Sequence, residues 1–85
     1  MEIVYLPKAD KDLDYWIKTD NKAILKKIAQ LTEAIINNPY SGTGKPEALK
    51  YQLAGKWSRR INDEHRYVYQ IESDILKVYS LRGHY

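Results

Sequence analysis

The C-terminal half of the sequence holds the three kinds of side chain that acid–base chemistry on a phosphodiester requires. Cleavage of RNA without a metal needs a base for the ribose 2′-hydroxyl, an acid for the departing 5′-oxygen, and cations for the charge that develops around phosphorus. Glu47 is a candidate base, His84 a candidate acid and Arg66 a candidate cation. Each assignment is weak alone, but together the three side chains form a complete catalytic set.

Four further side chains are candidates for holding such a substrate. Lys50 and Arg60 could share the cationic role, and arginine suits it because its planar fork can donate two hydrogen bonds to phosphate oxygens. Trp57 and Tyr85 could stack on a base or orient the phosphate.

Simpler interpretations of the histidines and glycines stay open. A C-terminal histidine such as His84 is commonly part of a solvated tail, and His65 is expected to be structural, at the edge of a hairpin. Two histidines without helical spacing make a poor metal site, so we predict neither a metal nor a cofactor. The Gly42-x-Gly44-Lys45 stretch lacks the spacing, the preceding strand and the following helix of a phosphate-binding loop.

The excess positive charge lies in one segment, residues 45–66. The net charge is +3, while residues 1–44 carry six lysines and six acidic residues and residues 67–85 also balance. The middle segment carries Lys45, Lys50, Lys56, Arg59, Arg60 and Arg66 against Glu47, Asp63 and Glu64. A basic segment of this kind suggests an anionic partner, although an ordinary solvated strand face would have the same composition.

The length of 85 residues predicts a single domain over residues 1–85 with a thin core. The absence of cysteine excludes disulfides, zinc–thiolate sites and a thiol nucleophile. The short apolar N-terminal run stops at Pro7 and lacks the features of a signal peptide, and no segment approaches the roughly 20 apolar residues of a membrane span. We therefore expect a soluble, cytoplasmic protein that does not enter a membrane.

The first half of the chain predicts one strand and two helices. Ile3–Leu6 is the expected strand, after which helical spacing runs through Ala9, Leu13, Trp16 and Ile17. Thr19 or Asp20 would cap the second helix, and Asn37-Asn38-Pro39 would end it. The expected buried stripe of that helix is Ile24, Ile28, Leu31 and Ile35.

The second half changes to a period of two, which is typical of strands. The expected strands are Leu49–Leu53, Trp57–Ile61, Tyr67–Ile71 and Ile75–Leu81. The short turns between them require antiparallel hairpins. The predicted architecture is therefore α+β, with the order β-α-α-β-β-β-β and two helices packed on one side of a curved, mainly antiparallel sheet.

One of these hairpins would bring two like charges together. A simple three-residue loop over residues 62–64 places Ile61 opposite His65 and Arg60 opposite Arg66. Like charges so placed destabilise a sheet, which is easier to explain if an anion binds between them. The alternative is that both arginines splay into solvent or pair with Asp63, Glu64 or Glu72.

The position of the C-terminal tail is not fixed by the strand pattern. A two-residue turn at Ser73-Asp74 pairs Arg66 with Leu81, which places His84 on the face opposite Arg66. The two side chains can meet if the tail turns after Gly83, as glycine permits, or if a bulge shifts the register.

Several segments taken together resemble one known family. They are Gly44-Lys45-Pro46-Glu47-Ala48-Leu49-Lys50, Leu53-x-Gly55-x-Trp57-Ser58-Arg59-Arg60-Ile61, Glu64-His65-Arg66-x-Val68-Tyr69 and the ending His84-Tyr85. The combined pattern resembles the YoeB/Txe-type toxins of the RelE/ParE toxin–antitoxin superfamily, over essentially the whole chain. One departure is Gly83, which stands where some relatives carry an aromatic residue.

The resemblance implies a RelE-like microbial ribonuclease fold and a ribosome-dependent endoribonuclease that cleaves mRNA in the A site and inhibits translation. By motif position it implies Glu47 as general base, His84 as general acid and Arg66 as transition-state cation. Lys50, Arg60 and Tyr85 would be supporting groups. It also implies a YefM/Axe-type antitoxin, homodimers, and contact with operator DNA only through the toxin–antitoxin complex.

Two other functional classes remain as alternatives. A ParE-like toxin shares the fold but acts by binding a protein such as gyrase, and an intact acid–base set argues against a pure binder. The second alternative is a catalytically inactive RNA-binding module.

Overall fold

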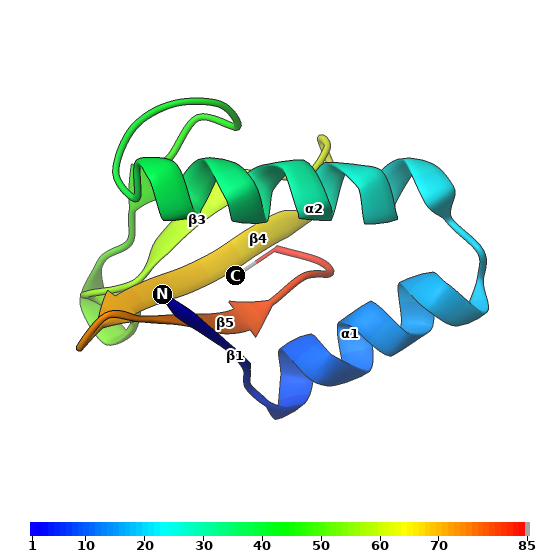
Figure 1. Ribbon diagram of the computed structural model, residues 1–85, viewed down its shortest axis with the longest axis horizontal. Coiled ribbons are helices and arrows are strands. Elements are labelled where there is room, and N and C mark those ends of the chain that lie inside the picture. Colours follow the sequence, from blue (N-terminus) through cyan, green and yellow to red (C-terminus); the bar gives the residue numbers. More distant parts are fainter. Residues whose placement is uncertain (85) are drawn as a thin grey trace.

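The computed structural model describes residues 1–84 and consists of helices packed against a single sheet (Figure 1). Its elements are β1 (Glu2–Tyr5), α1 (Pro7–Lys18), α2 (Lys22–Asn37), β2 (Glu47–Ala48), a 3₁₀ turn (Tyr51–Leu53), β3 (Trp57–Arg60), β4 (Arg66–Glu72) and β5 (Ile75–Ser80). The predicted order of one strand, two helices and four strands is confirmed. Within residues 1–84, no helix is long and apolar enough to cross a membrane.

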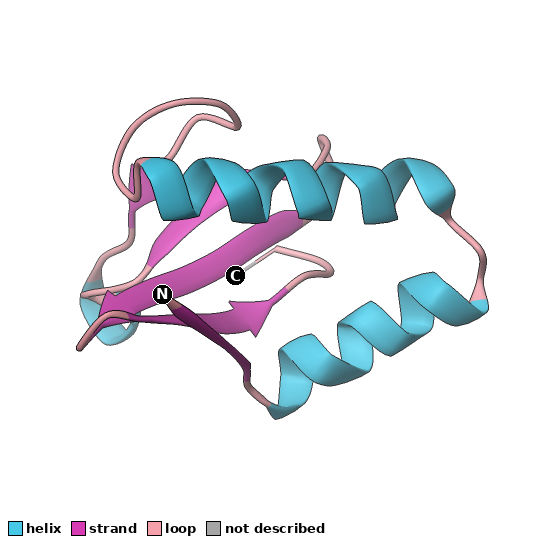
Figure 2. Cartoon of the chain, in the orientation of Figure 1, coloured by secondary structure: helices cyan, strands magenta, loops and turns pink. Residues whose placement is uncertain are grey.

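The five strands form one sheet in the order β1-β5-β4-β3-β2. β1 runs parallel to β5, and the other three pairs are antiparallel, as expected for a mainly antiparallel sheet. α1 and α2 pack on the same face of this sheet, which we call the inner face (Figure 2). The opposite, outer face carries the alternate side chains of the central strands: Ser58 and Arg60 of β3, and Arg66 and Val68 of β4.

The core lies between the helices and the inner face. α2 contributes the predicted stripe, and the sheet contributes fully buried residues that include Tyr67 and Tyr69. The Tyr67 hydroxyl lies 2.8 Å from the Thr32 hydroxyl, which satisfies this buried polar group. Burial raises the pKa of the Tyr67 phenol above its ordinary value, because the core disfavours the charged form.

The buried face of α1 differs from the prediction. Ala9 and Trp16 are buried as expected, but Ile17 is 56% exposed and Asp12 is buried instead. Asp12 lies three residues after Ala9 and four before Trp16, so the helical period places it on their face. Ile17 follows Trp16 by one residue, about 100° around the helix, and faces solvent.

The predicted N-cap of α2 is also wrong. Asn21 is the cap, and its side chain accepts a hydrogen bond from the Ile24 amide at 3.2 Å. Thr19 ends α1 instead, donating its hydroxyl hydrogen to the Tyr15 carbonyl at 2.9 Å. Asp20 lies in the turn between the helices with a positive φ of 53°. The end of α2 at Asn37 agrees with the prediction.

Residues 49–53 do not form the expected strand. The strand pairing lies earlier, at Glu47–Ala48, and the chain then turns through Tyr51–Leu53. The Leu53 amide donates to the Lys50 carbonyl at 3.1 Å, and Tyr51 has a positive φ of 58°. These local bonds replace a strand ladder; Leu49 is buried, whereas Tyr51 is 87% exposed.

The two predicted hairpins that join the last three strands are confirmed. Arg60 pairs with Arg66 across the 62–64 loop, and the Ile61 amide donates to the His65 carbonyl at 3.0 Å. Glu72 pairs with Ile75 across the two-residue turn, where Ser73 and Asp74 have φ values of 52° and 60°. Both central residues thus have the positive φ of the tight turns that match the twist of a hairpin.

Candidate active site on the outer face of the sheet

Strand pairing gathers most of the candidate residues on the outer face. Glu47 pairs with Ser58, which pairs with Val68, so these residues form one row across β2, β3 and β4. Arg60 and Arg66 form the neighbouring row, two residues further along. Directly paired residues share a face, so Glu47 and both arginines lie on the same side of the sheet. Two strand spacings, about 10 Å, separate the edge strand from the central one, which leaves room for a phosphodiester between them.

The guanidinium of Arg66 is held by the hairpin loop that precedes it. Nη1 donates to the carbonyl oxygens of Asn62 at 2.7 Å, Asp63 at 3.2 Å and His65 at 3.2 Å. Arg66 is 9% exposed, and within residues 1–84 no buried side-chain nitrogen or oxygen lacks a partner. Among the described residues these bonds use Nη1 alone, and Nε and Nη2 remain as donors for a ligand.

Arg60 differs from Arg66 in its surroundings, because its side chain is exposed. Among the residues that the structure describes, neither arginine has a carboxylate oxygen within 4.0 Å. The alternative in which Asp63, Glu64 or Glu72 neutralises the pair is therefore wrong. Within residues 1–84, two cations without a neutralising carboxylate thus lie on the same face.

Glu47 lies on the short edge strand that follows the longest loop. Its side chain is exposed. The loop is anchored where Gly44 accepts a hydrogen bond from the Arg60 amide at 2.7 Å. Gly44 has a φ of 85°, and a Cβ there would lie 2.8 Å from Leu31 Cδ2, so a side chain has no room. This close approach fixes the start of the strand that carries Glu47.

Lys50 borders the same hollow as Glu47. A cavity of about 370 Å³ is lined by residues 47–53, which include both side chains. The turn that replaced the predicted strand forms one wall of this hollow. A carboxylate and an ammonium group thus flank one depression at the edge of the outer face.

The C-terminal segment reaches Arg66 by both of the routes left open by the sequence. The register of β4 and β5 shifts between Val68 and Tyr69, which is a bulge, and Gly83 has a positive φ of 82°. The Arg66 amide donates to the Gly83 carbonyl at 3.0 Å. His84 therefore begins beside Arg66, and its side chain is exposed. Tyr85 lies outside the described residues.

Trp57 is not part of this arrangement. It pairs with Ala48 and lies on the inner face, where its ring is 4.9 Å from that of Tyr40. Strand alternation separates it from Glu47, Arg60 and Arg66. The structure therefore does not bring Trp57 together with the other candidate residues.

The basic segment does not form one continuous patch either. Arg59 is fully buried on the inner face, where it donates to the carbonyls of Asn38, Ser41 and Thr43 and to the Tyr69 hydroxyl. Its guanidinium holds the loop before β2 and is not part of a surface patch. Lys56 lies over the Tyr79 ring, 4.6 Å from the centroid.

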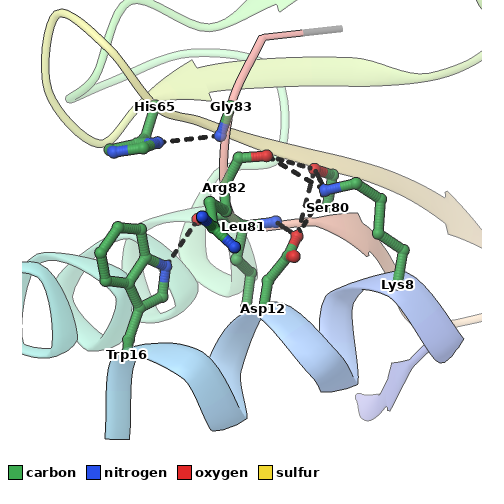
Figure 3. Close-up of polar contacts among 8 residues, drawn as sticks. All are labelled: Lys8, Asp12, Trp16, His65, Ser80, Leu81, Arg82 and Gly83. Atoms are coloured by element: carbon green, nitrogen blue, oxygen red, sulfur yellow. Dashed lines mark hydrogen bonds and ion pairs between the residues drawn. The ribbon is translucent and has the colours of Figure 1, made fainter. Parts of the chain in front are cut away.

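Sequence reasoning missed a group of buried polar residues behind the site, drawn in Figure 3. Asp12, Trp16 and His65 contact the backbone of residues 81–83. One signal was available: Asp12 falls on the apolar stripe of α1, where an unpaired carboxylate would be costly. Within residues 1–84, no group of three potential metal ligands lies together.

Sequence comparisons place the chain among bacterial toxins. The family described as "YoeB-like toxin of bacterial type II toxin-antitoxin system" matches residues 5–85. The chain is 44% identical over 85 residues, all of both chains, to Toxin YoeB of Escherichia coli K12. It is 51% identical over 73 residues, 85% of each chain, to Toxin YoeB of Synechocystis.

Solved structures agree with these relatives. The YoeB/ParE toxin from Agrobacterium tumefaciens superposes with a TM-score of 0.95 and 39% identity, covering all of both chains. A YoeB dimer and a YoeB-YefM complex, both from Staphylococcus aureus, give TM-scores of 0.90 at 41% and 42% identity, covering all of this chain and 98% of theirs. YafQ from E. coli, at 19% identity and a TM-score of 0.78, shares the fold. The chain therefore belongs to the YoeB-like toxins of bacterial type II toxin–antitoxin systems.

Proposed function

We propose that this toxin is a metal-independent endoribonuclease that cleaves mRNA in the A site of a translating ribosome and so inhibits translation. The observation that carries the proposal is the placement of Arg60 opposite Arg66, without a neutralising carboxylate in residues 1–84. Glu47 lies on the same face, and the backbone just before His84 is bonded to Arg66. A binder that makes no chemical change has no need of this acid–base set.

The roles follow from the chemistry of each group. Glu47 accepts the proton of the ribose 2′-hydroxyl, whose oxygen attacks phosphorus to form a 2′,3′-cyclic phosphate. Arg66 stabilises the charge on the phosphorane, with Arg60 and Lys50 as further cations. His84 donates a proton to the departing 5′-oxygen. Tyr85 is proposed to orient the phosphate.

The ribosome requirement fits the exposure of the site. Glu47, Arg60 and His84 are all exposed to solvent. Positioning of the substrate supplies much of an enzyme's rate enhancement. We propose that the ribosome supplies it here by presenting mRNA to the outer face.

The partners proposed for this chain follow from its relatives. A YefM/Axe-type antitoxin would bind and neutralise the toxin, and operator DNA would be contacted only by the toxin–antitoxin complex. The toxin would also form homodimers and act in the cytoplasm, where ribosomes are found.

Mapping mRNA 5′ ends after induction of the toxin tests the proposal in cells. We expect new ends within translated codons for the wild-type chain. Glu47→Gln, Arg66→Ala and His84→Gln should each relieve growth arrest while still co-purifying with the antitoxin. Growth arrest with DNA damage and no new mRNA ends would instead support the ParE-like, gyrase-binding alternative.

A further inference from the structure

Five backbone atoms near the C-terminus are held by residues far away in the sequence. Figure 3 shows these bonds except the one from the Arg66 amide. At Leu81, the amide donates to Asp12 Oδ2 at 3.0 Å, and the carbonyl accepts from Trp16 Nε1 at 3.0 Å. Both polar groups of one residue are thus taken by side chains of α1. The Arg82 carbonyl then accepts from Lys8 Nζ at 3.1 Å.

Gly83 is held in the same way from the other side. Its amide donates to His65 Nδ1 at 2.8 Å, and its carbonyl accepts from the Arg66 amide at 3.0 Å. The segment 81–83 is therefore fixed between α1 and the start of β4, although it lies beyond the last residue of β5. His84 follows directly.

The geometry at His65 indicates the tautomer of the neutral ring. Nδ1 can accept from the Gly83 amide only when it carries no hydrogen, so the neutral ring holds its proton on Nε2. Nε2 lies 3.6 Å from Glu64 Oε1. The ring also packs edge-on against Trp16, with centroids 4.8 Å apart. Trp16 and His65 thus support each other as well as the tail.

The polar side chains of Asp12 and His65 are both buried, so their hydrogen bonds need an explanation. Asp12 is 6% exposed and His65 8% exposed, and Asp12 is paired with Lys8 Nζ at 2.7 Å. A buried carboxylate or imidazole lowers stability unless it is hydrogen-bonded. An apolar residue would fill the same space at a smaller cost in folding free energy. Their hydrogen bonds are made to the backbone of residues 81 and 83. These bonds therefore fix the position of that segment.

We propose that Asp12, Trp16 and His65 form a clasp that positions residues 81–83 and thereby sets His84 beside Arg66. These three are positioning residues, because they act through the tail and not on the substrate. The consequence for cleavage rests on the proposed function, in which His84 is the general acid. The effect on the position of residues 81–83 is independent of the proposed function.

Variants of His65 separate its hydrogen bond from its bulk. His65→Asn keeps an acceptor oxygen in the place of Nδ1, whereas His65→Leu fills the space without one. Glu64→Gln is the matched control, since it changes the neighbouring residue and leaves the Nδ1 bond intact. Hydrogen exchange of the Gly83 amide, followed by NMR, reports the tail, and single-turnover cleavage on mRNA-programmed ribosomes reports the chemistry.

We expect His65→Leu to speed Gly83 exchange about tenfold, the factor that one lost hydrogen bond supplies. Cleavage should fall by a similar factor or more, with ribosome binding unchanged. His65→Asn and Glu64→Gln should remain close to the wild-type chain in both measurements. Wild-type exchange in His65→Leu, or an equal loss in a folded His65→Asn, would overturn the proposal.

A second variant covers the case in which His65→Leu does not fold. Trp16→Phe keeps an aromatic ring and removes the donor to the Leu81 carbonyl. It should also speed Gly83 exchange and slow cleavage, and unchanged values would overturn the clasp. If the wild-type chain cleaves no RNA, the proposed function fails, while the exchange measurement still decides whether the clasp exists.

Discussion

Arg60 and Arg66 lie directly opposite each other on adjacent antiparallel strands, with no carboxylate within 4.0 Å of either in the described part of the chain. Paired like charges destabilise a sheet by a few tenths of a kcal/mol to about 1 kcal/mol. This unfavourable pair lies where β4 also contacts the C-terminal segment, through the Arg66 amide. The proposed site is therefore expected to trade stability for activity.

Replacement of Arg60 tests this trade directly. Arg60→Gln should raise the free energy of unfolding by about 0.5 kcal/mol, because it removes the repulsion from Arg66. The same change should slow cleavage at least tenfold by removing a phosphate-binding cation. Urea denaturation and ribosome-dependent cleavage measure the two effects.

The control for Arg60→Gln is Lys56→Gln, which removes a cation placed over Tyr79, away from the pair. It should leave cleavage unchanged. A destabilised Arg60→Gln, or one with wild-type cleavage, would contradict the trade between stability and activity.

Replacement of Arg59, the neighbour of Arg60, should lower the free energy of unfolding instead of raising it. Arg59→Met removes the donor of three part-buried hydrogen bonds, those to the carbonyls of Asn38, Ser41 and Thr43. The expected loss is about 2–3 kcal/mol, since each lost hydrogen bond costs about 0.5–1.5 kcal/mol and the exposed carbonyls regain partners in water. Urea denaturation measures this loss. A free energy of unfolding no lower than that of the Lys56→Gln control would show that other contacts hold the loop.

Gly83 is required by backbone conformation and not by space. A Cβ at this position would meet nothing within 4 Å, but φ is 82°. Gly83→Ala should cost about 1 kcal/mol locally and slow cleavage by moving the tail. Gly83→Asn should retain more activity, because asparagine tolerates a left-handed conformation. Single-turnover cleavage compares the two variants, and equal rates in Gly83→Ala and the wild-type chain would contradict this role.

Buried tyrosines make stability fall at alkaline pH. Burial raises the pKa of Tyr67, so its contribution is complete below the ordinary tyrosine value near 10 and is lost as the pH rises above it. Unfolding free energy measured between about pH 9 and 11.5 should decline. Tyr67→Phe should flatten this decline, and an identical slope in that variant would place the effect elsewhere.

Local patterns in the sequence were sufficient for most of the elements and for the pairing next to the 62–64 and 73–74 turns. The period of the α2 stripe and the short turns at 62–64 and 73–74 predicted the second helix, both hairpins and the Arg60–Arg66 pair. These features depend on residues close together in the chain. The turn at Tyr51–Leu53 was not predictable in this way, because alternating apolar residues resemble a strand whether or not a partner is available.

Contacts between distant segments could not be read from the sequence. Asp12 and Leu81 are 69 positions apart, and neither residue alone indicates that one bonds the other. The bulge between β4 and β5 also depends on packing that no local signal records. For the same reason Trp57 was assigned to the site from its residue type, while its partner Ala48 places it on the inner face.

The central claim is that Glu47, Arg66 and His84 cleave mRNA on the ribosome. Toe-printing on a defined mRNA in a purified translation system, with and without ribosomes, tests it most directly. We predict cuts within the A-site codon for the wild-type chain only when ribosomes are present, and a loss of at least 100-fold, or about 2.7 kcal/mol, for Glu47→Gln, Arg66→Ala and His84→Gln. Undiminished cleavage by the Arg66→Ala or His84→Gln variant, or no cleavage by the wild-type chain on ribosomes, would contradict the claim.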